Sequence, residues 1–177
     1  MAEQHDNVVT IEPIDNLSIV TLKIAGNSIE SASDKLQLAP PVTASGSDPR
    51  SLWFGPDRWL LISSSLSADS MVKTCEEALA DVLHNAGDYS AGLAVFRVAG
   101  PGARDLLASG CGIDFRAKKF PVDSCCRTRF SQIAAIIVAQ GPEEFDIYVD
   151  RSYGVYLNDW LRESLSIAAS ANLLGTG

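Results

Sequence analysis

The chain has 177 residues, of which 46% are hydrophobic and 20% charged, a composition typical of a globular protein rather than a disordered one. Its net charge of −8 argues against nucleic acid or anionic lipid as the main partner, because clustered Lys and Arg bind both. The longest apolar run, 133–139, is much shorter than the roughly 20 residues of a membrane helix. Residues 1–7 lack the basic-then-apolar order of a secretory signal, so the cytoplasm is the expected location.

Hydrophobic periodicity predicts an α+β fold. The expected order fits two overlapping ferredoxin-like, split β-α-β units, each a sheet with helices on one face. In chain order the predicted elements are a strand at 17–25, a short helix within 26–36, a loop at 45–49, strands at 51–54 and 59–63, a helix at 67–85, a strand at 93–99, a helix at 101–109, two strands or one bent strand within 126–139, a strand at 145–150 and a final helix from about 152.

The helix at 67–85 has recognisable signals at both ends. Ser67 can cap its first turn, and Gly87 follows as a stop. This assignment places His84 in the C-terminal turn of the helix, where a cation is favoured.

The strand at 145–150 alternates apolar and polar residues. Asp146, Tyr148 and Asp150 occupy every second position, which predicts one solvent-facing side.

The expected organisation is a single domain with loose ends. Residues 1–16 are predicted to be a flexible start and 169–177 a frayed tail. Between them, 17–168 form a single α+β domain with approximate halves 17–87 and 88–168.

No motif for chemistry is complete. The run 100–105 follows a strand as a dinucleotide fingerprint does, but Asp105 holds the place of the last glycine and would repel a pyrophosphate. Cys125 and Cys126 are adjacent, so a strand would point them to opposite faces, away from a shared metal ion. His84 is the one histidine in a predicted element, and no G-x-S-x-G elbow is present. We therefore expect no catalytic, cofactor-binding or metal-binding residue in this chain.

Aromatic and basic residues are the candidates for a partner interface. Trp53 and Trp59 flank a tight turn, which favours at least one ring near the surface, although a core position is the alternative for each. A basic cluster within 116–129 could dock an acidic partner surface or a polyglutamyl ligand, or could be a solvated strand face. The cluster consists of Arg116, Lys118, Lys119, Arg127 and Arg129, and the candidate interface residues are Trp53, Arg58, Trp59, Arg116, Arg127 and Arg129.

Four stretches in register resemble the gamma subunits of heterotetrameric sarcosine oxidases. Leu52–Ser63 reads LWFGPDRWLLIS and is similar to the LWLGPDEWLL signature of that family, with Arg58 where the family usually has Glu. The remaining stretches, which match a "D-x-S … G-P-x-A-R-D-x-L" run, a "G-C-x-x-D-L … F" stretch and a "F-D-x-x-V-x-R-S" ending, are 88–107, 110–121 and 145–161.

The resemblance implies a fold like the folate-binding part of the glycine-cleavage aminomethyltransferase. In such complexes a beta subunit holds flavin, an alpha subunit holds the dinucleotide and tetrahydrofolate sites, and a delta subunit binds zinc. FAD, FMN, NAD, tetrahydrofolate and zinc are thus expected in partner subunits and none in this chain, and the family motifs are framework.

The expected function is that of a non-catalytic gamma subunit, which supports assembly of a sarcosine-oxidising complex with alpha, beta and delta partners. Two alternatives stay open. One is a stand-alone folate-binding or aminomethyltransferase-like protein, and the other is the equivalent subunit of an N-methylglutamate or dimethylglycine dehydrogenase.

Overall fold

The computed structural model describes residues 9–174, with side chains described as far as 167. The chain divides into two compact units that are not consecutive in sequence. The first unit consists of Asp15–Leu93 with Asp123–Arg127. The second unit consists of the described residues up to Ile14, Ala94–Val122, and the chain from Thr128 onward.

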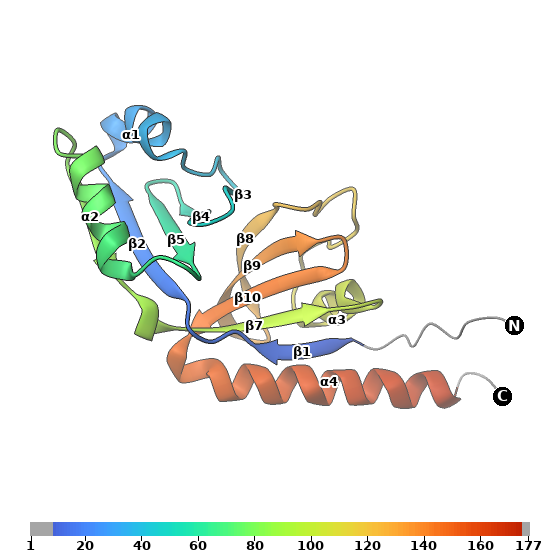
Figure 1. The fold of residues 1–177 in the computed structure, drawn as a ribbon. Coiled ribbons are helices and arrows are strands. Elements are labelled where there is room, and N and C mark those ends of the chain that lie inside the picture. The colour runs from blue at the N-terminus through green and yellow to red at the C-terminus, as the bar shows by residue number, and fades with distance from the viewer. Residues whose placement is uncertain (1–8, 175–177) are drawn as a thin grey trace, which may run out of the picture. The chain divides into compact units, whose positions relative to one another are not determined.

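The first unit is a split β-α-β fold. Its sheet has the order β3-β4-β5-β2-β6, of which β2 to β5 are labelled in Figure 1. The inner strand β2 pairs antiparallel with β5 on one side and with β6 on the other. Without the two-residue β3, this is the arrangement of a ferredoxin-like unit, in which two β-α-β halves interleave. Its elements are β2 (Ser18–Ile24), η1 (Gly26–Ser28), α1 (Ile29–Leu36), β3 (Ala44–Ser45), β4 (Arg50–Gly55), β5 (Arg58–Ser63), α2 (Ala68–Ala78), β6 (His84–Asp88) and η2 (Ser90–Gly92).

The second unit repeats this plan with one strand supplied from the start of the chain. Its sheet has the order β1-β7-β10-β9-β8, and β1 pairs antiparallel with β7 (Figure 1). The earliest strand therefore takes the place that β6 has in the first unit. Its elements are β1 (Thr10–Pro13), β7 (Leu93–Ala99), α3 (Ala103–Gly110), β8 (Cys125–Phe130), β9 (Ile133–Gly141), β10 (Glu144–Asp150), η3 (Arg151–Tyr153) and α4 (Gly154–Leu174). The first three residues of β8 and the first residue of β7 are counted with the first unit.

Each unit has its own apolar core. In the first, alternate residues of β2 pack against α2, which begins where the Ser67 hydroxyl accepts a hydrogen bond from the Ser70 N–H at 3.2 Å. In the second, the Phe130 ring is fully buried and meets Trp160 of α4 edge-on, with centroids 5.0 Å apart. Burying one such side chain stabilises the fold by about 1.5–3 kcal/mol.

Most predicted elements are confirmed, and the segment 126–139 forms two strands. The predicted helix at 67–85 is wrong in its second half. The helix ends at Ala78, and residues 84–88 form β6, so His84 and Gly87 are strand residues. The apolar residues of 79–83 continue a helical spacing, but the open edge of β2 offers backbone partners that a helix does not use.

The prediction that one side of the strand at 145–150 faces solvent is also wrong. Asp146 is 3% exposed and Tyr148 is 2% exposed, while Asp150 is exposed as predicted. The sheet is covered on both faces along β10, which single-strand alternation does not reveal.

Ordered structure extends beyond the limits of the predicted elements at both ends. β1 lies within the segment expected to be a flexible start, and α4 continues to Leu174, inside the segment expected to fray. Residues 1–8 and 175–177 lie outside the described residues. Within 9–174, no helix is both long and apolar enough to cross a membrane.

Candidate functional site

The part of the chain that the structure describes contains no group of three His, Cys, Asp or Glu side chains placed to hold a metal ion. The turn at 100–105 does not form a phosphate cradle. Gly102 adopts φ +92° as the residue before α3, and that helix has eight residues with Asp105 in its first turn. A carboxylate at that position repels the anion that a helix N-terminus would otherwise attract.

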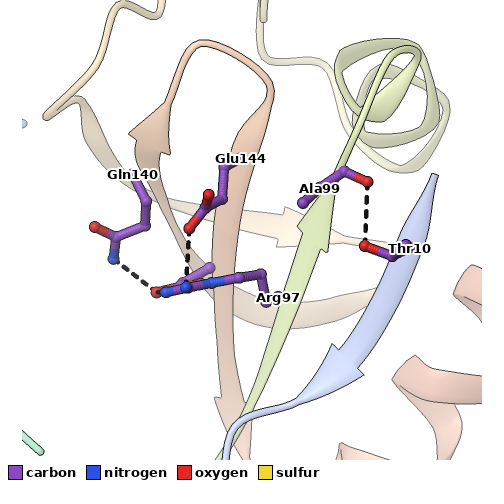
Figure 2. A network of polar contacts seen from close by, with 6 residues as sticks. Thr10, Arg97, Ala99, Gln140 and Glu144 are labelled. Carbon is purple, nitrogen blue, oxygen red and sulfur yellow. Dashed lines mark hydrogen bonds and ion pairs between the residues drawn. The ribbon is translucent and has the colours of Figure 1, made fainter. Parts of the chain in front are cut away.

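A buried carboxylate in the second unit, that of Asp146, is held by side chains of two neighbouring strands, including the Arg97 and Gln140 drawn in Figure 2. Asp146 accepts two hydrogen bonds from Arg97, Nε to Oδ1 at 2.8 Å and Nη2 to Oδ2 at 3.0 Å. Gln140 Nε2 donates to the same Oδ2 at 2.6 Å, and Arg97 Nη1 lies 2.9 Å from Glu144 Oε1. Hydrogen bonding to Asp146 raises the pKa of Arg97. Three hydrogen bonds therefore hold the carboxylate and tie β7, β9 and β10 together.

The same view shows how the edge strand is held. The Thr10 hydroxyl donates to the Ala99 carbonyl at 3.4 Å, which fastens β1 to β7 (Figure 2). The Ile14 N–H donates to Val95 O at 2.9 Å and continues the ladder. On the free edge of β1, Pro13 has no N–H and Arg162 Nη2 donates to Ile11 O at 3.4 Å. These features protect the edge against pairing with another strand.

A second arginine fixes the loop between α3 and β8. Arg104 Nε donates to Pro142 O at 2.8 Å, and its Nη1 donates to the carbonyls of Phe115 and Phe120, the latter at 3.1 Å. The guanidinium also lies over the Phe145 ring, 5.0 Å from its centroid. Arg104 therefore acts as a clamp on a loop that has no helix or strand of its own.

The interface candidates in the first unit occupy different environments. Trp59 is 3% exposed, and its Nε1 donates to Ala39 O at 2.8 Å, so it belongs to the core. Trp53 is half-buried against that core. Arg58 is exposed, and its Nε lies 3.4 Å from Asp57 Oδ1.

Arg127 lies on a segment next to Trp53. Its guanidinium stacks on the Phe54 ring at 4.8 Å from the centroid. The neighbouring Cys125 thiol donates to Trp53 O at 3.4 Å. The first unit therefore brings Trp53 and Arg127 to adjacent segments and leaves Trp59 inside.

The candidates in the second unit are both exposed. Arg116 binds Asp114 through Nε at 2.9 Å, and this hydrogen bonding lowers the pKa of Asp114 to about 2. Arg129 Nε donates to Gln132 O at 3.1 Å. Arg127 and Arg129 alternate with less exposed residues along β8, as predicted for one strand face.

Sequence reasoning missed the roles of Arg97, Arg104 and Asp146. One signal was available, because Arg97 interrupts the apolar run 93–99, and a charge carried into a buried strand needs a partner. The partner itself could not be found, since Asp146 is 49 positions away.

Sequence reasoning also missed a repeated turn. Asp88 accepts hydrogen bonds from the Ser90 N–H and hydroxyl at 2.8 and 2.6 Å, and Asp150 does the same for Ser152 at 3.0 and 2.6 Å. In both cases the hydroxyl and N–H of the serine lower the pKa of the aspartate. Each D-x-S turn joins a strand to a 3-10 helix, one turn in each unit.

The chain belongs to the class of α+β proteins built from two split β-α-β units, and its motif residues hold loops and turns of those units in place. The fold is shared with a heterotetrameric sarcosine oxidase from Corynebacterium sp. U-96 in complex with pyrrole 2-carboxylate, at a TM-score of 0.80 and 22% identity over 91% of this chain and 85% of that chain. It is also shared with the glycine cleavage system aminomethyltransferase T of Bartonella henselae, at a TM-score of 0.61 and 13% identity, over 86% of this chain and 45% of that one.

The family follows from the sequence comparison. The chain belongs to the sarcosine oxidase, gamma subunit family, whose model matches residues 25–168. Sarcosine oxidase gamma subunits of two Corynebacterium strains, U-96 and P-1, are 26% and 28% identical to it over 122 residues. Those matches cover 69% and 67% of this chain, and the chain spans 58% of the length of either relative.

Proposed function

We propose that this chain is a non-catalytic gamma subunit that supports assembly of a heterotetrameric sarcosine oxidase. The complex would convert sarcosine, tetrahydrofolate and O2 to glycine, methylenetetrahydrofolate and H2O2. Membership of the gamma subunit family is the observation that carries the proposal.

The placement of the family motifs supports a framework role. Arg104 uses its donors on backbone carbonyls, and the Asp88 and Asp150 carboxylates are taken up by serines of their own turns. A catalytic acid, base or nucleophile needs an atom within reach of a substrate. The hydrogen bonds of these motif residues are made within the chain, by the Arg104 guanidinium and by Oδ1 of each aspartate.

Partners and cofactors are part of the same proposal. We assign the flavins FAD and FMN, NAD, tetrahydrofolate and zinc to alpha, beta and delta subunits. Of the predicted interface residues, we retain Trp53, Arg58 and Arg127 in the first unit and Arg116 and Arg129 in the second, and leave out the buried Trp59. A cytoplasmic location is proposed because none of the four cysteines forms a disulfide, as a reducing compartment favours.

Co-expression tests the proposal. The tagged chain, produced with candidate alpha, beta and delta subunits, should co-purify with them and with sarcosine-dependent H2O2 formation. The chain produced alone should show no flavin absorbance and no turnover. Calorimetry with tetrahydrofolate is the control, since micromolar binding by the lone chain would favour a stand-alone folate protein and refute the assembly role.

A further inference from the structure

The loop between α3 and β8 carries a short exposed turn held between two buried rings. Phe115 is 2% exposed and Phe120 is 5% exposed, whereas every residue of 116–119 is exposed. The N–H groups of Lys119 and Phe120 both donate to Arg116 O, at 2.8 and 2.9 Å. We call residues Phe115–Phe120 the anchored turn.

The anchored turn is held by ring packing on Phe145 and by hydrogen bonds from Arg104. The Phe115 and Phe120 rings meet edge-on with centroids 5.1 Å apart, and both pack on Phe145. Arg104 donates to the carbonyls of both phenylalanines. A segment held in this way loses little conformational entropy when a partner binds it.

The two lysines of the anchored turn differ from the other lysines of the chain. Among the residues whose side chains the structure describes, neither Lys118 nor Lys119 has an ion pair within 4.0 Å. The nearby Asp114 carboxylate is bonded by Arg116, and Lys119 acts on it only through longer-range charge attraction. The chain nevertheless carries a net charge of −8, so acceptors are abundant elsewhere on it. The remaining lysines are paired: Lys23 with Asp57, Lys35 with Asp81 and Lys73 with Glu77.

We infer that the anchored turn is a docking element that presents Lys118 and Lys119 to an acidic surface on a protein partner. The inference rests on the proposed function, in which that partner is another subunit of the complex. An exposed turn does not enclose a small ligand, because ligand sites are concave and bury most of what they bind. Two exposed ammonium groups instead match carboxylates spread over a protein surface, where charges govern association rate and partner choice.

Charge reversal within the assembled complex tests the inference. Complexes are purified with the wild-type chain, with Lys118→Glu/Lys119→Glu, or with Lys118→Gln/Lys119→Gln. The matched control, Lys23→Glu/Lys73→Glu, makes the same change in net charge on the first unit. Retention of the chain after serial dilution is measured by native mass spectrometry at about 50 mM and about 500 mM salt, where the Debye length falls from roughly 14 to 4 Å.

At low salt, the Glu variant should leave the complex at roughly ten-fold higher concentration than wild type, with the Gln variant between them and the control unchanged. The difference should shrink several-fold at high salt. Equal retention of the Glu variant and the control, or a loss that salt does not alter, would overturn the inference and leave the proposed function standing. Failure of the wild-type chain to co-purify with any subunit would overturn both.

Discussion

Replacing Arg97 by Met should destabilise the chain by about 2–3 kcal/mol, because it leaves a buried carboxylate with one donor. The Asp146 side chain is 4% exposed, so water cannot replace the two lost hydrogen bonds. The Arg97 side chain is 40% exposed, so the ion pair is only partly buried, which keeps the expected loss below the full cost of breaking a wholly buried pair.

Urea and thermal unfolding of the full chain measure this loss. For a chain of this size, the expected fall in Tm is about 4–12 °C. Lys73→Met is the matched control, since its ion pair with Glu77 spans 3.8 Å between side chains that are 74% and 69% exposed, and its removal should cost less than about 0.5 kcal/mol.

A double variant separates the buried charge from simple loss of contacts. Arg97→Met/Asp146→Leu should recover much of the lost stability, because it removes the carboxylate that Arg97→Met leaves underpaired. If Arg97→Met is no more costly than Lys73→Met, or if the second substitution recovers nothing, the reasoning about this network is refuted.

Two further predictions concern packing and thiol chemistry. Gly110→Ala should lower the free energy of unfolding in urea by about 1–3 kcal/mol, because an added Cβ would lie 2.3 Å from the buried Phe130 ring. The control Gly112→Ala adds a Cβ that meets nothing within 4 Å, so it should change stability much less. Equal effects of the two substitutions would contradict the packing argument. Burial raises the pKa of Cys125 to about 12, so its thiol should stay protonated from pH 7 to 10. Over this range Cys125 should react slowly with a thiol reagent, and the partly exposed Cys111 should react first. Because that pKa lies above the ordinary thiol value of 9.0, the native state holds the Cys125 proton to higher pH than the unfolded chain does. The stability that the buried thiol contributes should therefore be lost as pH rises from about 9 toward 12. Early modification of Cys125 in the native chain would contradict this assignment.

Local pattern alone predicted much of the fold. The apolar run 93–99 is β7 at the same residues, and the Ser67 cap and the turn between β4 and β5 are where the sequence places them. These features depend on side chains a few positions apart, so they can be read from one stretch of chain. The family likeness was visible in the same way, as short motifs in register.

Partners distant in sequence were decided only by the tertiary structure. His84 lies in a strand because β2 offers it an edge, and Thr10 is ordered because β7 lies beside it. Asp146 is buried because Arg97 and Gln140 supply donors that its own strand lacks. Periodicity indicates which face of a helix or strand a side chain lies on. The free energy of pairing and burial depends on the residues that pack against that face, and only the tertiary structure determines which residues those are.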